Sequence, residues 1–116
     1  MKLLHVTIHT DKFEEELKFY RDIVGLKITR DMRPEGGKPV FLADEEDDTE
    51  IEIIETPGAG NAGSENLSIG FRTENLHKKR EELIGLGLEA TPIISPVPQV
   101  RFFFVKDPAG VKVQFM

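Results

Sequence analysis

Three side chains of types that bind transition metals lie on predicted strands far apart in the chain, namely His5, Glu52 and Gln114. Imidazole nitrogen, carboxylate oxygen and amide oxygen are all ligands for a divalent transition-metal ion. Around each of the three residues, apolar and polar side chains alternate, which is the pattern of a strand with one buried face. His5, Glu52 and Gln114 are therefore predicted on polar sheet faces, where they could form three points of an open metal site.

The polar faces of these strands also have a simpler interpretation. A sheet covered by a helix on one side normally exposes its other side to water. A single histidine in a strand is more often structural than a ligand, and His5 exceeds that expectation only through its partnership with Glu52. His77 falls early in a predicted helix without such a partner and is expected to be exposed.

Hydrophobic periodicity predicts two segments with the same order of elements. In the first, a strand over 3–10 and a helix over 11–24 precede strands over 27–32, 39–43 and 50–55. In the second, a strand over 67–73 and a helix over 74–86 precede strands over 89–94, 100–106 and 111–116. Asp11 is predicted to cap the first helix, and Leu76, Leu83 and Leu86 of the second are predicted to face the core.

The two segments align as an internal repeat. Residues 4–11 align with 67–74, residues 51–53 with 113–115, and Phe41-Leu42 with Phe103-Phe104. This superposition pairs His5 with Ser68 and Glu52 with Gln114, and Ser68 is a poor metal ligand. We therefore predict an α+β fold in which two tandem βαβββ modules form curved mixed sheets around a cleft. The expected single domain, 1–116, comprises module one (1–56), a linker rich in Gly, Ala and Asn (57–66) and module two (67–116).

Composition excludes several classes of partner. A net charge of −6, with no basic stripe and no tryptophan, argues against nucleic acid, because phosphate binding needs clustered lysine and arginine. No stretch approaches the ~18 consecutive apolar residues of a membrane-spanning helix. The lack of cysteine excludes disulfides and thiolate metal sites and is compatible with the cytoplasm, which is the expected localisation.

Two further motifs match known patterns only in part. Residues 58–63 (Gly-Ala-Gly-Asn-Ala-Gly) fit the dinucleotide-binding fingerprint, but a strand is predicted after them where that motif needs a helix. The acidic run 44–50 is similar to a calcium loop, but Thr49 stands where that loop needs glycine. We interpret the first as linker and the second as a solvated hairpin tip.

Four stretches, taken in order, resemble the signature sequences of one known superfamily. They are 2–5 (Lys-Leu-Leu-His), 19–26 (Phe-Tyr-Arg-Asp-Ile-Val-Gly-Leu), 51–53 (Ile-Glu-Ile) and 107–115 (Asp-Pro-Ala-Gly-Val-Lys-Val-Gln-Phe). The chain thereby resembles the vicinal oxygen chelate superfamily, which includes glyoxalase I, bleomycin-resistance proteins, fosfomycin-resistance proteins and extradiol dioxygenases. The resemblance covers nearly the whole chain and is closest to small bacterial glyoxalase I.

The resemblance implies two βαβββ modules, usually paired across a homodimer, with a metal site where strands of two modules meet. His5 would be the first metal ligand and Glu52 the second. Ser68 stands where glyoxalase I has a histidine, and Gln114 stands where it has a glutamate. The remaining donors carry one negative charge, so weak binding of nickel, cobalt or zinc is expected.

The same resemblance implies catalytic and substrate-binding positions. In glyoxalase I, the glutamate replaced here by Gln114 is the base that abstracts a proton next to a carbonyl. An amide does not accept that proton near neutral pH, so Glu52 would have to serve as the base from a different angle. His9 stands where bacterial glyoxalase I has an arginine that holds glutathione. His9, Ser68 and Arg72 are accordingly predicted to contact the substrate.

Two functions remain open from the sequence. The first is a divergent, glyoxalase I-like (lactoylglutathione lyase-like) enzyme that binds a divalent metal and acts on a small oxygenated substrate as a lyase or isomerase. The second is a metal-independent protein that sequesters a small molecule, as bleomycin-resistance proteins do. Both predict a small-molecule ligand and a homodimer, with neither nucleic acid nor a membrane as partner.

Overall fold

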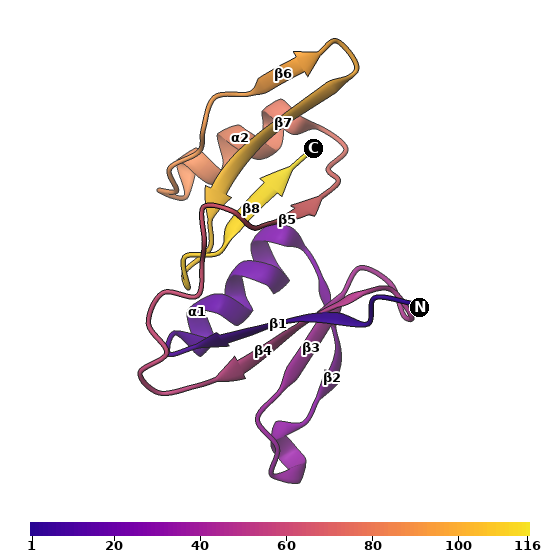
Figure 1. The fold of residues 1–116 in the computed structure, drawn as a ribbon, viewed down its shortest axis with the longest axis vertical. Coiled ribbons are helices and arrows are strands. Elements are labelled where there is room, and N and C mark those ends of the chain that lie inside the picture. Colours follow the sequence, from indigo (N-terminus) through magenta and orange to yellow (C-terminus); the bar gives the residue numbers. More distant parts are fainter. The chain divides into compact units, whose positions relative to one another are not determined.

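Alternating apolar and polar residues form two four-stranded sheets in the computed structural model, which describes residues 1–116 (Figure 1). The chain divides into two compact units, Met1–Ala62 and Gly63–Met116, with one sheet in each. The elements of the first unit are β1 (His5–Thr10), α1 (Phe13–Lys18), a π-helical segment (Phe19–Val24), β2 (Lys27–Asp31), a 3-10 turn (Arg33–Glu35), β3 (Val40–Ala43) and β4 (Glu50–Glu55). The elements of the second are β5 (Ser68–Phe71), α2 (Leu76–Gly85), β6 (Ile94–Val97), β7 (Val100–Lys106) and β8 (Lys112–Phe115).

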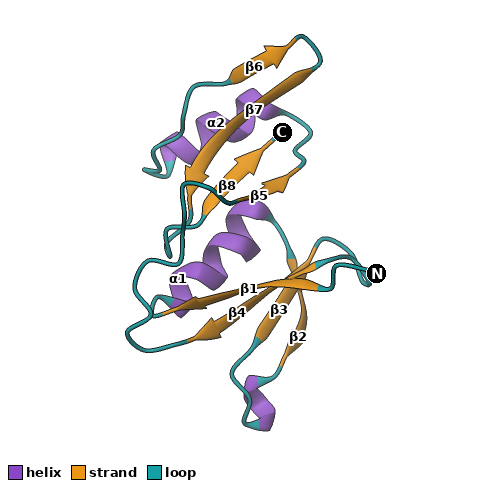
Figure 2. Cartoon of the chain, viewed as in Figure 1, coloured by secondary structure: helices purple, strands orange, loops and turns teal.

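The two sheets have the same topology. The strand order is β1-β4-β3-β2 in the first unit and β5-β8-β7-β6 in the second. In each sheet the first strand runs parallel to its neighbour, and the other neighbours are antiparallel. The predicted α+β fold of two βαβββ modules with mixed sheets is confirmed. Turns and loops make up most of the chain between β4 and β5 (Figure 2).

The helix of the first unit presents one apolar face to the sheet. Phe13, Leu17 and Tyr20 recur at spacings of four and three residues, and all three are buried. α1 packs against β4, and its π-helical continuation ends at Gly25, whose φ of 89° lies in the left-handed region that favours glycine. None of the helices combines the length and hydropathy needed to cross a lipid bilayer.

Two details of the predicted helices are wrong. Asp11 does not cap the first helix; Lys12 precedes it instead, and the Lys12 N–H donates a hydrogen bond to the hydroxyl of Thr10. In α2 only Leu83 is fully buried. Leu86 is 59% exposed and follows the last residue of the helix, where the helical spacing that would bring it to the core no longer applies.

The predicted strand over 89–94 is also wrong, since β6 spans Ile94–Val97. Within the predicted segment, Thr91 bonds to β7. Its N–H donates to the Phe104 carbonyl at 3.0 Å, and its hydroxyl accepts the Phe104 N–H at 2.9 Å. Pro92 has no N–H to offer, so regular pairing cannot continue through this segment.

The strand ladders shift one part of the predicted superposition of the modules, the match of Phe41 with Phe103, by one residue. Phe41 of β3 lies opposite Glu52 of β4, and Phe104 of β7 lies opposite Gln114 of β8. Phe104 is therefore the counterpart of Phe41. Phe103, which the sequence alignment had placed there, is completely buried in the core.

An ion pair holds the turn that follows β2. The Arg33 guanidinium donates to both carboxylate oxygens of Asp31, at 2.9 and 2.8 Å. These bonds, with a further one from the Arg33 backbone N–H, lower the pKa of Asp31 to about 2. Because the pKa of an unfolded aspartate is higher, about 3.9, the pair stabilises the folded state above about pH 4, and this stabilisation is lost as the pH falls toward 2.

We expect Asp31→Asn to lower the urea midpoint of unfolding slightly at pH 7, because the exposed pair contributes little. The difference from the parent should shrink between pH 4 and pH 2, where the parent carboxylate itself becomes protonated. Asp44→Asn is the matched control, since Asp44 is exposed and makes no ion pair. Equal midpoints for the parent and Asp31→Asn at pH 7 would contradict a stabilising role of the pair.

Candidate functional site

The first unit brings one predicted pair of ligands together. β1 and β4 pair in parallel, with Thr7, two residues after His5, directly opposite Glu52. His5 Nε2 consequently lies 3.5 Å from Glu52 Oε1. The side chain of Glu52 is 12% exposed and that of His5 is 38% exposed, so the carboxylate is largely enclosed while the imidazole is accessible.

Thr7 is a site residue that the sequence reasoning missed. Its hydroxyl donates a hydrogen bond to Oε1 of Glu52, the same atom that faces His5. The carboxylate therefore has two neighbours on β1, of which Thr7 forms a hydrogen bond with it. The signal available in the sequence was the position of Thr7 between His5 and His9, because alternate residues of a strand share a face.

A second carboxylate on this face is already neutralised. Glu50 accepts a hydrogen bond from the Thr29 hydroxyl at 2.5 Å and lies 3.6 Å from the Arg30 guanidinium. Arg30 in turn covers the ring of Phe41 at 4.2 Å, and the His5 ring meets Phe41 edge-on. A register shift in β2 between Ile28 and Arg30 allows the consecutive residues Thr29 and Arg30 both to contact Glu50. Glu50 is thus engaged, and Glu52 is the carboxylate that faces His5.

Gln114 occupies in the second unit the position that Glu52 occupies in the first, with a glycine where Glu52 has Thr7. It lies on β8 between Gly70 and Phe104 and is half-buried. Gly70 is the counterpart of Thr7, since Thr7 lies opposite Glu52 and Gly70 lies opposite Gln114. A Cβ at Gly70 would lie 3.3 Å from Gln114 Oε1, so the glycine leaves space beside the amide where Thr7 bonds to Glu52.

The three residues predicted to contact substrate are all exposed. Ser68 opens β5 opposite Lys112, and Arg72 directly follows the end of β5. His9 lies on β1, where its Nδ1 is 3.0 Å from the hydroxyl of Thr56. Their exposure suits contact with a ligand, and their role in binding stays a prediction.

The structure therefore brings together His5 and Glu52 of the predicted metal ligands. Gln114 and Ser68 belong to the second unit, and the gathering of residues from both units at one site stays a prediction. Neither unit by itself places three or more imidazole and carboxylate side chains close enough to hold a metal ion. The amide oxygen of Gln114 is of a suitable type to add to the pair in the first unit.

The sequence of the chain matches one protein family along nearly its whole length. The sequence model of the Glyoxalase/Bleomycin resistance protein/Dioxygenase superfamily matches residues 2–115, almost the entire chain. The chain belongs to this superfamily. The resemblance on which the site prediction was based is thus confirmed at the level of the family.

Relatives of this glyoxalase-superfamily chain include two lactoylglutathione lyases. The enzyme of Neisseria meningitidis serogroup A is 29% identical over 126 positions, which cover 100% of this chain and 90% of the relative. That of Haemophilus influenzae is 26% identical and covers 100% of this chain and 92% of its own. The similarity therefore extends along the full length of this chain.

Solved structures share the fold at lower sequence identity. Glyoxalase I of Leishmania major superposes with a TM-score of 0.77 at 23% identity, covering 100% of this chain and 86% of that one. The antibiotic binding protein TnmS3 from Streptomyces sp. CB03234 superposes with a TM-score of 0.76 at 18% identity, covering 99% and 93%. An enzyme and a binding protein thus share this architecture.

Proposed function

We propose that this protein is a glyoxalase-like lyase or isomerase that acts on a small oxygenated substrate with the help of a divalent metal ion. Its ligands for nickel, cobalt or zinc would be His5, Glu52 and Gln114. The observation that carries the proposal is the 3.5 Å approach of His5 Nε2 to Glu52 Oε1 on the polar face of one sheet. The full-length similarity to lactoylglutathione lyases supports the reaction class.

The donor set suits such an ion. Zinc lies about 2.1 Å from imidazole nitrogen and carboxylate oxygen, so two ligands in tetrahedral geometry are about 3.4 Å apart. The distance between His5 Nε2 and Glu52 Oε1 is close to that value. Glu52 supplies the only negative charge of the set, since His5 and Gln114 are neutral ligands. We therefore expect lower affinity than at a site with two carboxylates.

The residues divide the proposed chemistry between them. When bound, the ion would polarise an oxygen of the substrate and make an adjacent C–H more acidic. Glu52 is the group available to accept that proton, because the amide of Gln114 is not basic near neutral pH. Thr7 holds Oε1 of Glu52 through its hydroxyl, which leaves Oε2 to take the proton. Gln114 would hold the ion through its amide oxygen and orient the substrate oxygen through its N–H donors, without moving a proton.

Three further side chains are proposed to contact the substrate. The exposed side chains of His9, Ser68 and Arg72 would bind the substrate away from the reacting atoms. Because the donors are divided between two modules, we propose that the site forms where unlike modules meet, in one chain or across a homodimer. The protein would act on its small-molecule ligand without nucleic acid or membrane.

A second candidate function is metal-independent sequestration of a small molecule. The observation that favours it is the pair Ser68 and Gln114, which leaves the predicted ligand positions of the second unit without an ionised group. TnmS3, described as an antibiotic binding protein, supports the compatibility of this fold with binding. The same polar sheet faces would then hold the ligand without a reaction.

Calorimetric titration of the metal-free protein with nickel distinguishes the two candidates. We expect binding of one ion per chain, weakened at least ~10-fold in His5→Ala, because a lost ligand should cost no less than a lost supporting partner. His9→Ala is the matched control, since this histidine faces Thr56 rather than a carboxylate. No binding by the parent, or equal loss in both variants, would favour sequestration.

A further inference from the structure

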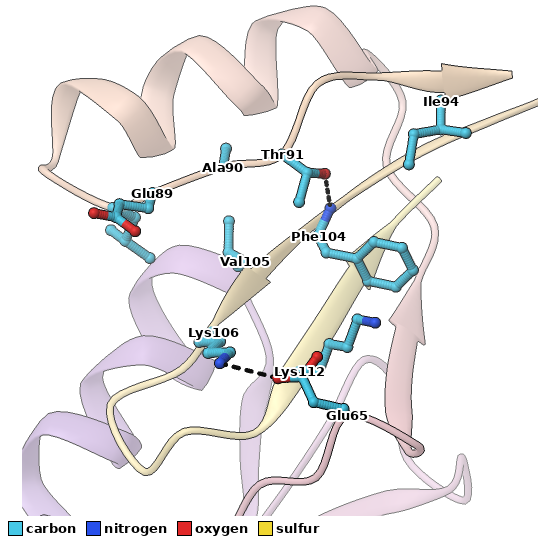
Figure 3. Close-up of a pocket in the computed structure, with 10 residues that line it drawn as sticks. Glu65, Glu89, Ala90, Thr91, Ile94, Phe104, Val105, Lys106 and Lys112 are labelled. Atoms are coloured by element: carbon cyan, nitrogen blue, oxygen red, sulfur yellow. Dashed lines mark hydrogen bonds and ion pairs between the residues drawn. The ribbon is translucent and has the colours of Figure 1, made fainter.

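The second unit contains a cavity of about 660 Å³ beside the polar face of its sheet. One wall is the segment that carries Thr91 and Ile94, and the other is formed by Phe104 of β7 and Lys112 of β8 (Figure 3). The hydrogen bonds between Thr91 and the Phe104 backbone fix the two walls to each other. The cavity is therefore formed within the second unit, between the segment that precedes and begins β6 and the strands β7 and β8.

One cation in this cavity is uncompensated. The Lys112 ammonium lies 4.4 Å from the centroid of the Phe104 ring, and no carboxylate lies within 4 Å of it. The other lysine of the cavity, Lys106, is paired with Glu65 at 3.3 Å (Figure 3). Lys112 thus offers its N–H donors to a ligand above an aromatic surface, whereas Lys106 is already engaged.

The internal repeat supplies a control for this arrangement. Lys112 is the counterpart of Glu50, because Glu50 lies opposite His5 and Lys112 lies opposite Ser68. In the first unit the cation above the ring is Arg30, and Glu50 neutralises it. The corresponding cavity there, at Thr29, Arg30 and Glu50, is smaller, about 300 Å³. The second unit therefore has a cation, Lys112, where the first has the carboxylate of Glu50, and the cavity beside Lys112 is the larger one.

We propose that this cavity binds the carboxylate of a small molecule with an apolar body. The carboxylate would accept hydrogen bonds from Lys112, and the body would lie against Phe104 and Ile94. A single negative charge fits better than a phosphate dianion, because Glu65 and Glu89 also line the cavity and would repel the second charge.

The proposed site would place its ligand next to Gln114. Lys112 and Gln114 are two residues apart on the same face of β8, so their side chains emerge about 7 Å from each other. A ligand anchored on Lys112 would direct an oxygen on its other end toward the amide. The inference rests on the proposed function only in taking this face as the ligand-binding face, and it names the substrate class as apolar carboxylates.

NMR titration of the metal-free, ¹⁵N-labelled protein with phenylacetate tests the proposal, with phenylacetamide as the uncharged probe of the same shape. We expect phenylacetate to shift the amide resonances of Thr91, Phe104 and Lys112 and to bind roughly tenfold more tightly than phenylacetamide, because charge-assisted hydrogen bonds are the stronger ones. Equal affinities for the two probes, or shifts confined to other residues, would overturn the proposal.

Variants identify the cation responsible. Lys112→Met keeps the stem over Phe104 and should weaken phenylacetate binding roughly tenfold while leaving phenylacetamide unchanged. Lys112→Arg should retain preference for the acid, and Lys78→Met, which removes an exposed lysine of α2 outside the cavity, should bind phenylacetate as the parent does. Unchanged binding in Lys112→Met, with a parent-like spectrum, would contradict the assignment.

The two proposals fail separately. Lys112→Met should bind nickel like the parent, because residue 112 is not among the proposed ligands. Failure of nickel binding in the parent would remove the metal-dependent function and leave the phenylacetate result intact. Failure of phenylacetate binding with normal nickel binding would remove the carboxylate site alone.

Discussion

Gln114→Glu is expected to tighten nickel binding by about ten- to a hundredfold, measured by calorimetry on the metal-free protein. Ligand charge tunes the affinity of a metal site, and this change adds a second carboxylate to Glu52. The magnitude is at least that seen when a supporting partner of a ligand is altered. Glutamate has the same shape as glutamine, and Gly70 opposite residue 114 has no Cβ to contact Oε1, so the substitution adds charge without adding bulk.

Gln99→Glu is the matched control for this gain. It introduces the same charge change on an exposed side chain between β6 and β7, at a residue that is not among the proposed ligands. The control should bind nickel as the parent does. Parallel tightening in both variants would indicate a general electrostatic effect, and no tightening in Gln114→Glu would mean that residue 114 does not contact the ion.

Leu83→Ala is expected to lower the free energy of unfolding by about 2–5 kcal/mol, measured by urea denaturation. Leu83 is completely buried, so truncation removes its transfer free energy and leaves a cavity beneath α2. Leu86→Ala is the matched control, since it deletes the same atoms from a side chain that is 59% exposed. Its effect should stay within about 0.5 kcal/mol.

The pair of leucine variants tests which side of α2 faces the core. The sequence pattern treats Leu83 and Leu86 alike, because both fit helical spacing from Leu76. The structure separates them at the helix end. A similar loss of stability in both variants would contradict the exposed position of Leu86, and no loss in Leu83→Ala would contradict its burial.

The arrangement of elements was predictable because it depends on local patterns. Alternation, helical spacing and helix-ending glycines are readable within a few residues, and they led to the repeated βαβββ order that the sheets confirm. The prediction failed where the structure of a segment depends on its neighbours in space. The segment 89–94 has strand-like composition, yet Pro92 interrupts its pairing and the edge strand forms farther along, at Ile94–Val97.

Strand register was the other failure, and it bears directly on the site. The alignment by pattern made Phe103 the counterpart of Phe41 in the second module. The strand ladders show that the counterpart is Phe104. A shift of one residue changes a side chain from the polar face to the core, because successive side chains point to opposite faces. Phe104 lines the proposed carboxylate cavity for that reason, and Phe103 does not.

The sequence by itself determined which donor groups are present, namely the imidazole of His5, the carboxylate of Glu52 and the amide of Gln114. It also determined that each lies on the polar face of its strand. Only the tertiary structure decided what each one meets, such as the Thr7 hydroxyl at Glu52 and Gly70, which has no side chain, at Gln114. The physical reason is that a side chain's face follows from the local two-residue period of a strand, whereas its cross-strand neighbour depends on pairing between segments distant in the chain.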